Sequence, residues 1–520
     1  MPTATGSVHI NVDNIYCQIK SGATDEVDDI LDNAFSYLMD GYRHMQAFKT
    51  GKWDGRKRLY TKLRRFPTGL LSEAKKLLED ANHTITITDQ RVRPDKDTRR
   101  WNLRGAEERE HQMEAIVAAL EEGRGIIWHS TGSGKTEVMA GIIQMLDLPA
   151  IVMVNQALIA EQTAERLAKR IGKKIGLYSS GKRRDGQIVV ATFQTLQSKL
   201  KDDKENQTQT LRKWLAQYQV LAIDEAHHTL ARTYQEVINE CPAYYRYAFS
   251  ATPEKTQDKG ARLHIVGSTG PVLDTFTAGE GVEAGLLVRA DVTMIHWHQD
   301  KPKAWWKAPD FEINDRNYTY VGKKTQLVDR GDGKMIRVPL AKKDQVPGLY
   351  ETAIVKNEPR NSFIVDGVSL MLEDDRQVLV LVERIDHGLM LKKRIEKECG
   401  VQVLFMQGSD SSDIRATKKR QFSDEGYRVM VATTIMDEGV DLPAIDGLVL
   451  AAGGKAQHRI IQRLGRGMRP KEGKESLAVL DFMDTNSATM WRHSKERRKV
   501  YKSDAGGYHL EETEINADAS

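Results

Sequence analysis

The chain has 520 residues, of which 77 are lysine or arginine and 73 are aspartate or glutamate, so the formal net charge is only +4. Hydrophobic residues make up 40% of the sequence, which is enough for several buried cores and excludes a mainly disordered chain. No stretch approaches the ~18 uncharged apolar residues of a membrane-spanning helix, and the N-terminus lacks the basic and apolar regions of a secretory signal. The three cysteines form neither a metal-binding spacing nor a disulfide framework. We therefore expect an intracellular, cytoplasmic protein of several domains.

Residues 1–100 are predicted to form a small α/β domain with an uneven distribution of charge. Residues 43–65 carry nine bases and one acid, Asp54, and aromatic side chains are interleaved with them. Bases and aromatic residues together suit phosphate contact combined with stacking on nucleic-acid bases. A solvated basic face above a small core explains the same pattern equally well. The near-neutral total therefore hides a basic segment whose partner the composition leaves open.

From about residue 106, apolar runs such as PAIVMV and QIVVAT alternate with helical stretches. Strands that are apolar on both faces and separated by helices are typical of a parallel sheet covered on both sides. The pattern returns after residue 350, so we predict two similar α/β domains, residues 101–288 and 350–485.

The segment between these two domains and the C-terminal tail are less regular. Residues 289–349 are predicted to be an inter-domain insertion rich in aromatic residues. The insertion fits either a strand-separating element or a β-rich excursion packed on the second domain, and we favour the second interpretation. Residues 486–520 are predicted to be a basic and then acidic extension whose last dozen residues lack regular structure.

Residues 126–136, IIWHSTGSGKT, combine a buried-strand pattern with a glycine-rich loop and the start of a helix. Gly132 and Gly134 allow backbone N–H groups to turn toward a phosphate. Lys135 would then reach the β- and γ-phosphates of a nucleotide, and Thr136 would ligate Mg²⁺. The strict phosphate-loop pattern has a further glycine where this chain has His129. The strand before the loop and the helix after it still favour nucleotide binding over an ordinary turn.

A second motif, VLAIDEAHH at residues 220–228, places two adjacent carboxylates at the end of an apolar strand. Asp224 is predicted to hold the Mg²⁺ shell, and Glu225 to orient and deprotonate the attacking water. The histidines that follow, His227 and His228, raise metal ligation as an alternative. Because no third ligand is clustered with them in the sequence, we favour a coupling or structural role for His227.

Four segments in chain order closely resemble the motifs of the DEAH-box-containing superfamily 2 helicases. They are HSTGSGKT, DEAH at 224–227, SAT at 250–252 and QRLGRGMR at 462–469. The resemblance covers both predicted α/β domains and implies that they are tandem RecA-like lobes, which close around ATP and Mg²⁺. It also implies an ATP hydrolase whose partner is a nucleic acid.

The same resemblance implies roles in the nucleotide site. Gln112 would bond the adenine, and Arg466 and Arg469 would be arginine fingers that neutralise the γ-phosphate when the lobes close. The implied catalytic set is Lys135, Asp224, Glu225, Gln462, Arg466 and Arg469. The implied nucleotide-binding set is Arg109, Gln112, Gly132, Ser133, Gly134, Lys135, Thr136, Glu137, Gly439 and Asp441.

Other motif positions are implied to contact nucleic acid or to couple its movement to hydrolysis. The implied coupling residues are His227, Ser250 and Thr252. Thr192, Gln194 and Thr433 are the implied contacts to the phosphate backbone. Short hydroxyl and amide side chains suit phosphate binding without base reading.

GKWDGRKRL at 51–59 and FPTGLL at 66–71 resemble the N-terminal domain of phage UvsW-type helicases. These helicases act on branched DNA in recombination, repair and replication-fork rescue. The resemblance favours DNA binding by the basic segment, with the contacts Arg43, Lys52, Trp53, Arg56, Lys57 and Arg58. It also implies a phage-encoded protein, and we expect a monomer.

These patterns predict an ATP-dependent DNA helicase or translocase that unwinds or branch-migrates forked and recombination-intermediate DNA. Two alternatives stay open, because backbone-contacting motifs identify neither the sugar nor the outcome of movement. The first is an RNA helicase, and the second is an ATP-switched duplex-DNA translocase without strand separation. Removal of residues 1–100 is expected to reduce the preference for branched DNA while leaving some basal ATP hydrolysis.

Overall fold

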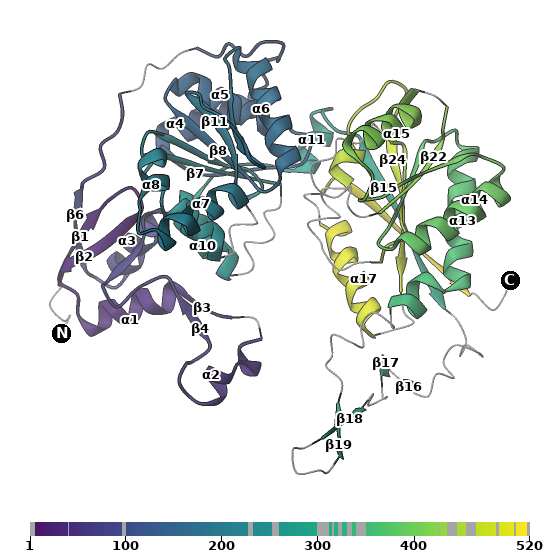
Figure 1. Cartoon of the computed structure of the whole chain (residues 1–520), viewed down its shortest axis with the longest axis horizontal. Helices are drawn as coiled ribbons and strands as arrows, with labels where there is room; N and C mark the ends of the chain where they lie inside the picture. The colour runs from purple at the N-terminus through teal and green to yellow at the C-terminus, as the bar shows by residue number, and fades with distance from the viewer. Residues whose placement is uncertain are drawn as a thin grey trace. The chain divides into compact units, whose positions relative to one another are not determined.

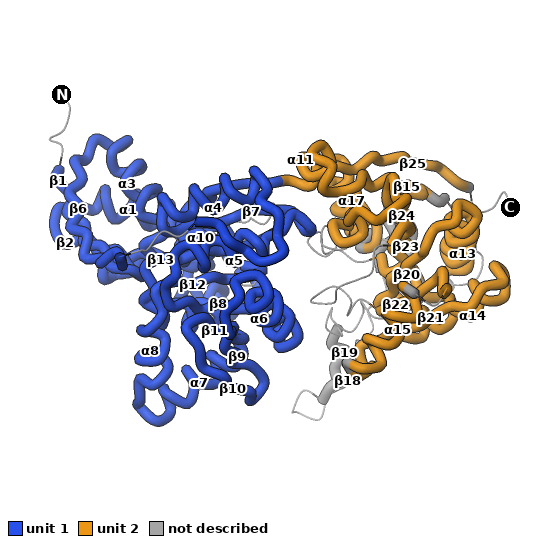
Figure 2. Tube along the Cα trace, turned by 90° about the horizontal axis from the view of Figure 1, so that it is seen from above, with its two compact units in different colours: residues 1–276 blue, residues 277–520 orange. Residues whose placement is uncertain are grey.

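The computed structural model describes residues 6–39, 41–95, 100–226, 232–251, 259–298, 311–314, 317–320, 325–329, 335–339, 350–424, 426–433, 445–453, 464–484, 488–503 and 506–516. The chain divides into two compact units, Met1–Phe276 and Thr277–Ser520, shown in blue and orange in Figure 2.

The first unit begins with a small sheet and two helices (Figure 1). Their bounds are β1 (Ser7–Val12), β2 (Tyr16–Ser21), α1 (Asp25–Ala34), β5 (Arg65–Pro67), η2 (Thr68–Leu70), α3 (Leu71–Asp80) and β6 (Thr84–Asp89). The strand order is β5-β2-β1-β6, with β2 antiparallel to β1 and β6 parallel to it. Thr24 caps α1, and the two helices bury Val27, Leu31, Ala74 and Leu78.

A basic hairpin belongs to this N-terminal domain. Its strands β3 (Ser36–Leu38) and β4 (Arg56–Arg58) are antiparallel, and the chain between them carries η1 (Tyr42–His44) and α2 (Gln46–Lys49). The rings of Tyr42 and Phe48 pack edge to face with their centroids 4.8 Å apart. Trp53 Nε1 donates to Arg56 O at 2.7 Å. These contacts give the segment 41–55 a small aromatic centre.

The rest of the first unit, the first lobe, is built on an eight-stranded sheet in the order β10-β9-β11-β8-β12-β13-β7-β14. All its described pairings are parallel except that of β10 with β9. The strands are β7 (Arg124–His129), β8 (Ala150–Val154), β9 (Gly176–Ser179), β10 (Lys182–Arg184), β11 (Ile188–Thr192), β12 (Val220–Ile223), β13 (Tyr245–Ser250) and β14 (Val272–Phe276). The helices are α4 (Glu110–Glu122), α5 (Lys135–Leu146), α6 (Ala157–Ile171), α7 (Phe193–Glu205), α8 (Thr210–Leu215), α9 (Arg232–Ile238) and α10 (Lys259–Thr269).

Alternate residues of these strands enter two different cores, because successive side chains of a strand point to opposite faces. In β12, Val220 and Ala222 pack in the core that includes α4, α5 and α6. Leu221 and Ile223 pack in the core that includes α7, α8, α9 and α10. The predicted α/β class, with helices on both sides of a parallel sheet, is therefore confirmed.

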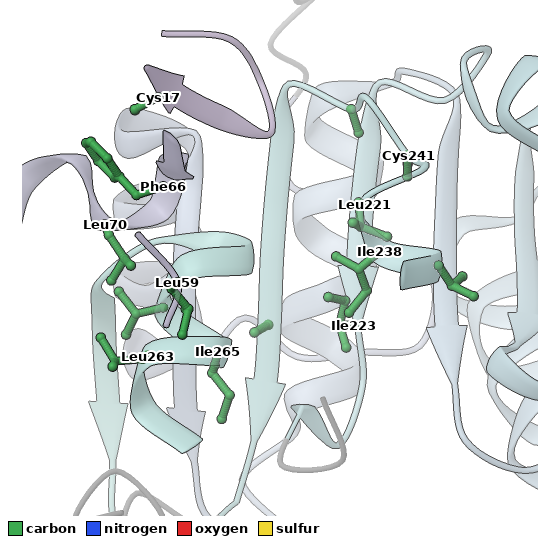
Figure 3. Packing of buried hydrophobic residues seen from close by; sticks show 14 of the residues in the cluster. Cys17, Leu59, Phe66, Leu70, Leu221, Ile223, Ile238, Cys241, Leu263 and Ile265 are labelled. Carbon is green, nitrogen blue, oxygen red and sulfur yellow. The ribbon is translucent and has the colours of Figure 1, made fainter. Parts of the chain in front are cut away.

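The core on the α10 side continues into the N-terminal domain. Leu59, Phe66 and Leu70 belong to the same buried cluster as Leu263 and Ile265 of α10 (Figure 3). The N-terminal domain and the first lobe therefore share one hydrophobic core.

Polar and backbone contacts reinforce this junction. The guanidinium of Arg262 donates two hydrogen bonds of 2.8 Å to the carboxylate of Glu73. Gly69 lies so close to α10 that an added Cβ would be 1.8 Å from Val266 O. Only glycine fits such an approach between two backbones.

The second unit contains a seven-stranded sheet in the order β21-β22-β20-β23-β24-β15-β25, and all its described pairings are parallel. The strands are β15 (Arg289–His298), β20 (Val378–Val382), β21 (Val403–Met406), β22 (Val429–Thr433), β23 (Gly447–Leu450), β24 (Ser476–Met483) and β25 (Tyr508–Asn516). The helices are α11 (Ala278–Glu283), η7 (Glu351–Val355), α13 (Glu358–Glu373), α14 (Ile385–Cys399), α15 (Ser412–Asp424) and α17 (Ala488–Tyr501).

Buried ion pairs hold α13 and α17 to this sheet. Arg360 of α13 and Asp484 are both fully buried, with Nε 2.7 Å from Oδ1. Arg497 of α17 pairs with Asp481 at 2.8 Å, and Tyr501 Oη donates to the same carboxylate. Burial removes water from these charges, so loss of either member of a pair would leave the other charge buried and uncompensated.

The structure differs from the sequence expectations at both irregular segments. β15 lies in the predicted insertion but is an interior strand between β24 and β25. The last dozen residues are predicted to lack regular structure, but those as far as Asn516 belong to β25, which pairs with β15 from Tyr508 to Asn516. Their polar composition suits an edge strand, where charged side chains face water.

Further described parts of the insertion form two hairpins, β16 (Phe311–Asn314) with β17 (Asn317–Tyr320) and β18 (Thr325–Asp329) with β19 (Met335–Pro339). The compact units divide between residues 276 and 277, before the predicted lobe boundary at 288. The helices in the described ranges lack the combined length and apolar character needed to cross a membrane.

Candidate active site

The glycine-rich loop at residues 130–134 connects the end of β7 to the N-terminus of α5. Gly132 and Gly134 have φ values of 95° and 94°, in the left-handed region that favours glycine. An added Cβ at Gly134 would lie 2.2 Å from Gln112 Nε2. The positive φ favours glycine at 134, any larger residue there would displace the Gln112 amide, and the helix N-terminus that follows suits an anion.

Lys135 folds back over this loop. Its ammonium donates to the carbonyl oxygens of His129 at 2.9 Å and Ser130 at 3.1 Å. Gln112 Nε2 donates to Ser133 O at 3.0 Å, and His111 Nε2 lies 3.0 Å from the same oxygen. The predicted adenine-reading segment thus contacts the phosphate loop directly.

His129, which stands where the strict pattern has glycine, does not obstruct the loop. Its side chain is fully buried, with Nε2 2.5 Å from Asp274 Oδ2 on the neighbouring strand β14. Burial lowers the pKa of His129 more than the hydrogen bond to Asp274 raises it, so the neutral ring donates to the carboxylate. The ring also lies beside His111 and Phe276, whose own rings stack with centroids 4.0 Å apart.

The acidic pair follows β12, at the same edge of the sheet as the glycine-rich loop. β12 pairs with β13 and β13 with β7, so the carboxyl ends of the three strands bring Asp224, Ser250 and the loop to one edge. Asp224 N donates to Met153 O, and Glu225 N donates to Asp224 Oδ1, both at 3.0 Å. Glu225 has a φ of 49°, a conformation that is uncommon outside glycine and is found at functional sites.

The side chains at this edge fit a nucleotide with a divalent metal. The Ser130 hydroxyl and Gln112 Oε1 are buried and have no hydrogen-bond partner within the described chain, although buried polar groups are normally satisfied. In the described ranges, no three His, Cys, Asp or Glu side chains are grouped to hold a metal ion by themselves. The predicted ligands Thr136 and Asp224 would supply two oxygens, so a divalent ion held by them would also need phosphate and water oxygens.

The second unit carries its own part of the predicted site. Arg466 and Arg469 lie in a short turn whose neighbours Leu464 and Met468 are fully buried, and both arginines are half-buried. Thr433 ends β22 and has a buried hydroxyl without a hydrogen-bond partner among the described residues. Five predicted site residues lie outside the described residues: His227, Thr252, Gly439, Asp441 and Gln462.

Three family profiles match consecutive parts of the chain. "DNA helicase UvsW, N-terminal" matches residues 9–88, "Type III restriction enzyme, res subunit" residues 105–255, and "Helicase conserved C-terminal domain" residues 362–471. The ATP-dependent DNA helicase uvsW of Enterobacteria phage T4 is 23% identical over 496 residues, covering 90% of this chain and 88% of that protein. The chain is a superfamily 2 helicase related to UvsW.

A second relative and a solved structure are also similar to the chain. The DNA 3'-5' translocase XPB2 of Sulfurisphaera tokodaii is 25% identical over 400 residues, covering 75% of this chain and 84% of that protein. A putative HsdR subunit of a type I restriction enzyme from Vibrio vulnificus has the same fold, with a TM-score of 0.51 and 16% identity, covering 79% of this chain and 69% of that one. The predicted resemblance is thus confirmed: the protein is an ATP-driven helicase enzyme that uses a nucleotide with a divalent metal and binds nucleic acid.

Two predicted nucleotide contacts of the helicase have structural partners. Arg109 is the N-cap residue of α4, and its carbonyl accepts from Gln112 N and Met113 N. The carboxylate of Glu137 receives hydrogen bonds from Arg166 at 2.7 and 2.9 Å and from Arg170 at 3.3 Å. These ion pairs join Glu137 at the start of α5 to α6, and its direct contact with nucleotide stays a prediction.

Two predicted nucleic-acid contacts of the first lobe also serve the fold. The Thr192 hydroxyl caps α7, accepting from Thr195 N at 3.4 Å. Gln194 Nε2 donates to Asn155 O at 2.5 Å and so joins the ends of β11 and β8. Gln194 remains exposed, whereas Thr192 is almost wholly buried.

The predicted DNA contacts of the N-terminal domain divide into two groups. Arg58 pairs with Asp32 at 2.9 Å and Asp54 at 2.5 Å, and it holds the pKa of Asp54 well below its usual range. Arg56 donates to the Ser36 hydroxyl, and Trp53 is half-buried against the hairpin. Arg58 and Arg56 are therefore occupied within the domain, and Lys57 is half-buried beside them.

The remaining bases of the segment 41–55 face solvent. Arg43, Lys49 and Lys52 are exposed, and none of them forms an ion pair within the described residues. Lys49, which ends α2, was not among the predicted contacts. A count of bases along the sequence could not separate these three from Arg58, because only the folded chain shows that Arg58 is paired with Asp32 and Asp54.

Proposed function

We propose that the protein is an ATP-dependent DNA helicase or translocase that unwinds or branch-migrates forked and recombination-intermediate DNA. The observation that carries the proposal is the meeting of the glycine-rich loop, Asp224, Glu225 and Ser250 at one sheet edge. The UvsW-type N-terminal match and the three exposed bases of the segment 41–55 favour branched DNA as the partner.

In the proposed cycle, Lys135 leaves the carbonyl oxygens of His129 and Ser130 and turns to the nucleotide phosphates. Thr136 and Asp224 hold the Mg²⁺ that accompanies the nucleotide. Glu225 orients the attacking water and takes its proton on the carboxylate. When bound, ATP supplies the phosphoanhydride bond whose hydrolysis drives the movement.

The second lobe is proposed to complete the reaction with Arg466 and Arg469, which stabilise the charge that develops on the transferred phosphoryl group. The Thr433 hydroxyl, buried and without a hydrogen-bond partner among the described residues, is proposed to bind a strand phosphate. Ser250, at the end of β13 between the acidic pair and the loop, is proposed to couple hydrolysis to strand movement.

The test is an ATP-hydrolysis titration with single-stranded, duplex, forked and four-way DNA and with matched RNA. Forked or four-way DNA is expected to stimulate turnover most, and Lys135→Ala and Glu225→Gln are expected to lower kcat at least 100-fold while the melting temperature stays near wild type. Stronger stimulation by RNA would favour an RNA helicase. Turnover with duplex DNA but no strand displacement would favour a translocase without unwinding, and DNA-independent turnover would overturn the proposal.

A further inference from the structure

The turn that follows the arginine segment 464–469 contains a lysine that points back into that segment. Residues 471–474 form a tight turn in which Lys474 N donates to Lys471 O at 3.0 Å, and Gly473 has a φ of 76°. The turn folds the Lys474 side chain toward the sheet, where it is half-buried.

The Lys474 ammonium donates to three backbone carbonyl oxygens. Two of them, Gly467 O and Arg469 O at 3.2 Å, belong to the arginine segment. The third acceptor, Ile445 O at 2.5 Å, lies two residues before the start of β23, and Ile445 itself is fully buried. A protonated lysine has three N–H donors, so each carbonyl can receive one of them.

The two acceptors in the arginine segment are carbonyl groups that this short helical segment cannot satisfy by itself. The last carbonyl groups of a helical turn have no partner within it, and a cation at that end is favourable. Leu464 and Met468 anchor the segment from its apolar side, while Lys474 holds its backbone at Gly467 and Arg469. Lys474 thereby joins the backbone that directly follows Arg466 to Ile445, next to β23.

Three charged groups among the described residues act on the ammonium: Asp446, Lys471 and Arg376. Asp446 faces it and raises its pKa, whereas Lys471 and Arg376 lower it, and burial is the largest influence, so that the pKa of Lys474 falls to about 8. Lys471 Nζ lies 3.7 Å from Asp446 Oδ2 and reaches none of the three carbonyl groups in the described hydrogen bonds. Lys471 is therefore a matched control within the same turn.

We propose that Lys474 is a positioning residue for ATP hydrolysis, which fixes the backbone of the arginine segment and thereby the direction in which Arg466 and Arg469 are presented. The inference rests on the proposed roles of these two arginines. Lys474 touches neither nucleotide nor DNA in this scheme; it acts through the peptide groups that carry the arginines.

The test is Lys474→Met, which keeps the length of the side chain and removes its donors. Misplacement of a charge-stabilising group by about 1 Å costs up to about 100-fold in rate. We therefore expect a 10- to 100-fold loss of DNA-stimulated kcat, with the KM for ATP within about twofold, because the glycine-rich loop is unchanged. Lys471→Met is expected to keep kcat within about twofold, and Lys474→Arg, which retains charge and donors, to recover part of the loss.

A double-variant cycle separates positioning from a general loss of stability. On an Arg466→Ala/Arg469→Ala background, measured in single turnover, Lys474→Met is expected to add less than a twofold loss, because its effect passes through residues already removed. A full additional loss on that background would overturn the inference, as would an unchanged kcat in Lys474→Met alone.

Should Lys474→Met fail to fold, Lys474→Arg is measured in the same cycle, and an equal loss with and without the two arginines overturns the inference. A wild-type protein without nucleic-acid-stimulated hydrolysis would instead overturn the proposed function itself. An active wild type with an indistinguishable Lys474→Met variant would overturn only the role of Lys474.

Discussion

The salt dependence of DNA binding distinguishes phosphate contacts from bases that serve the fold. Arg43, Lys49 and Lys52 are exposed and form no ion pair in the described structure, whereas Arg58 is held by two carboxylates. Each phosphate neutralised by a protein cation contributes ~0.9 to the slope of log affinity against log salt on duplex DNA. If all three exposed bases contact phosphates, replacing them with alanine is expected to lower the slope by 3 × 0.9, or about 2.7.

The assay is fluorescence anisotropy with a labelled forked DNA between about 50 and 200 mM salt, without nucleotide, a range over which phosphate contacts change affinity strongly. The control is Arg58→Ala, which removes one positive charge, as each of the three substitutions does, but from a base already paired with Asp32 and Asp54. Its slope is expected to stay within the experimental error of wild type. An unchanged slope in the triple variant, or a fall of about 0.9 in Arg58→Ala, would refute this division of the basic segment.

Two further predictions concern the junction between the N-terminal domain and α10. Gly69→Ala places a Cβ 1.8 Å from Val266 O and is expected to destabilise the first unit by ~1–3 kcal/mol in thermal unfolding, whereas Gly6→Ala, with 3.4 Å to its nearest neighbour, stays near wild type. Burial lowers the pKa of His264 to about 4, below that of the unfolded chain, so the unfolded state takes up this proton first and stability falls as the pH drops from about 6.5 to about 4. Thermal melts across this pH range are expected to show that His264→Asn reduces the acid loss of stability by roughly 3 kcal/mol. Replacement of the exposed His44 is expected to leave the acid loss of stability unchanged. Parallel curves of stability against pH for the wild type and both variants would contradict the role of His264.

Motifs that depend on local chain geometry were predictable. A buried strand followed by glycine, lysine and a helix fixes its own conformation, and the structure places the loop, Asp224 and Ser250 at one edge because parallel strands end together. The sequence shows that His129 replaces the first glycine of the strict phosphate-loop pattern, but it does not show that the histidine side chain is buried away from the loop. Its partner, Asp274, follows 145 positions later on an adjacent strand.

Features that depend on distant partners escaped sequence reasoning. The acidic end of the chain becomes β25 only because β15 offers it a parallel neighbour. Lys474 looks like a surface lysine in a polar turn until the fold brings Ile445 and Gly467 within its reach. Arg58 and Lys52 carry the same charge, and only the positions of Asp32 and Asp54 separate them.

The shared core also changes what removal of residues 1–100 can reveal. That truncation was expected to leave basal ATP hydrolysis, yet it would strip Leu59, Phe66 and Leu70 from Leu263 and Ile265 of α10. Each buried side chain of this size contributes ~1.5–3 kcal/mol, while whole domains are stable by only ~5–15 kcal/mol. We therefore expect the truncated protein to lose the cooperative melt of the first unit, and its hydrolysis with it, so that lost activity would not identify a DNA-binding role. A truncated protein that melts cooperatively and hydrolyses ATP at the wild-type basal rate would show that α10 tolerates solvent; otherwise, the surface substitutions at Arg43, Lys49 and Lys52 are the way to separate DNA binding from folding.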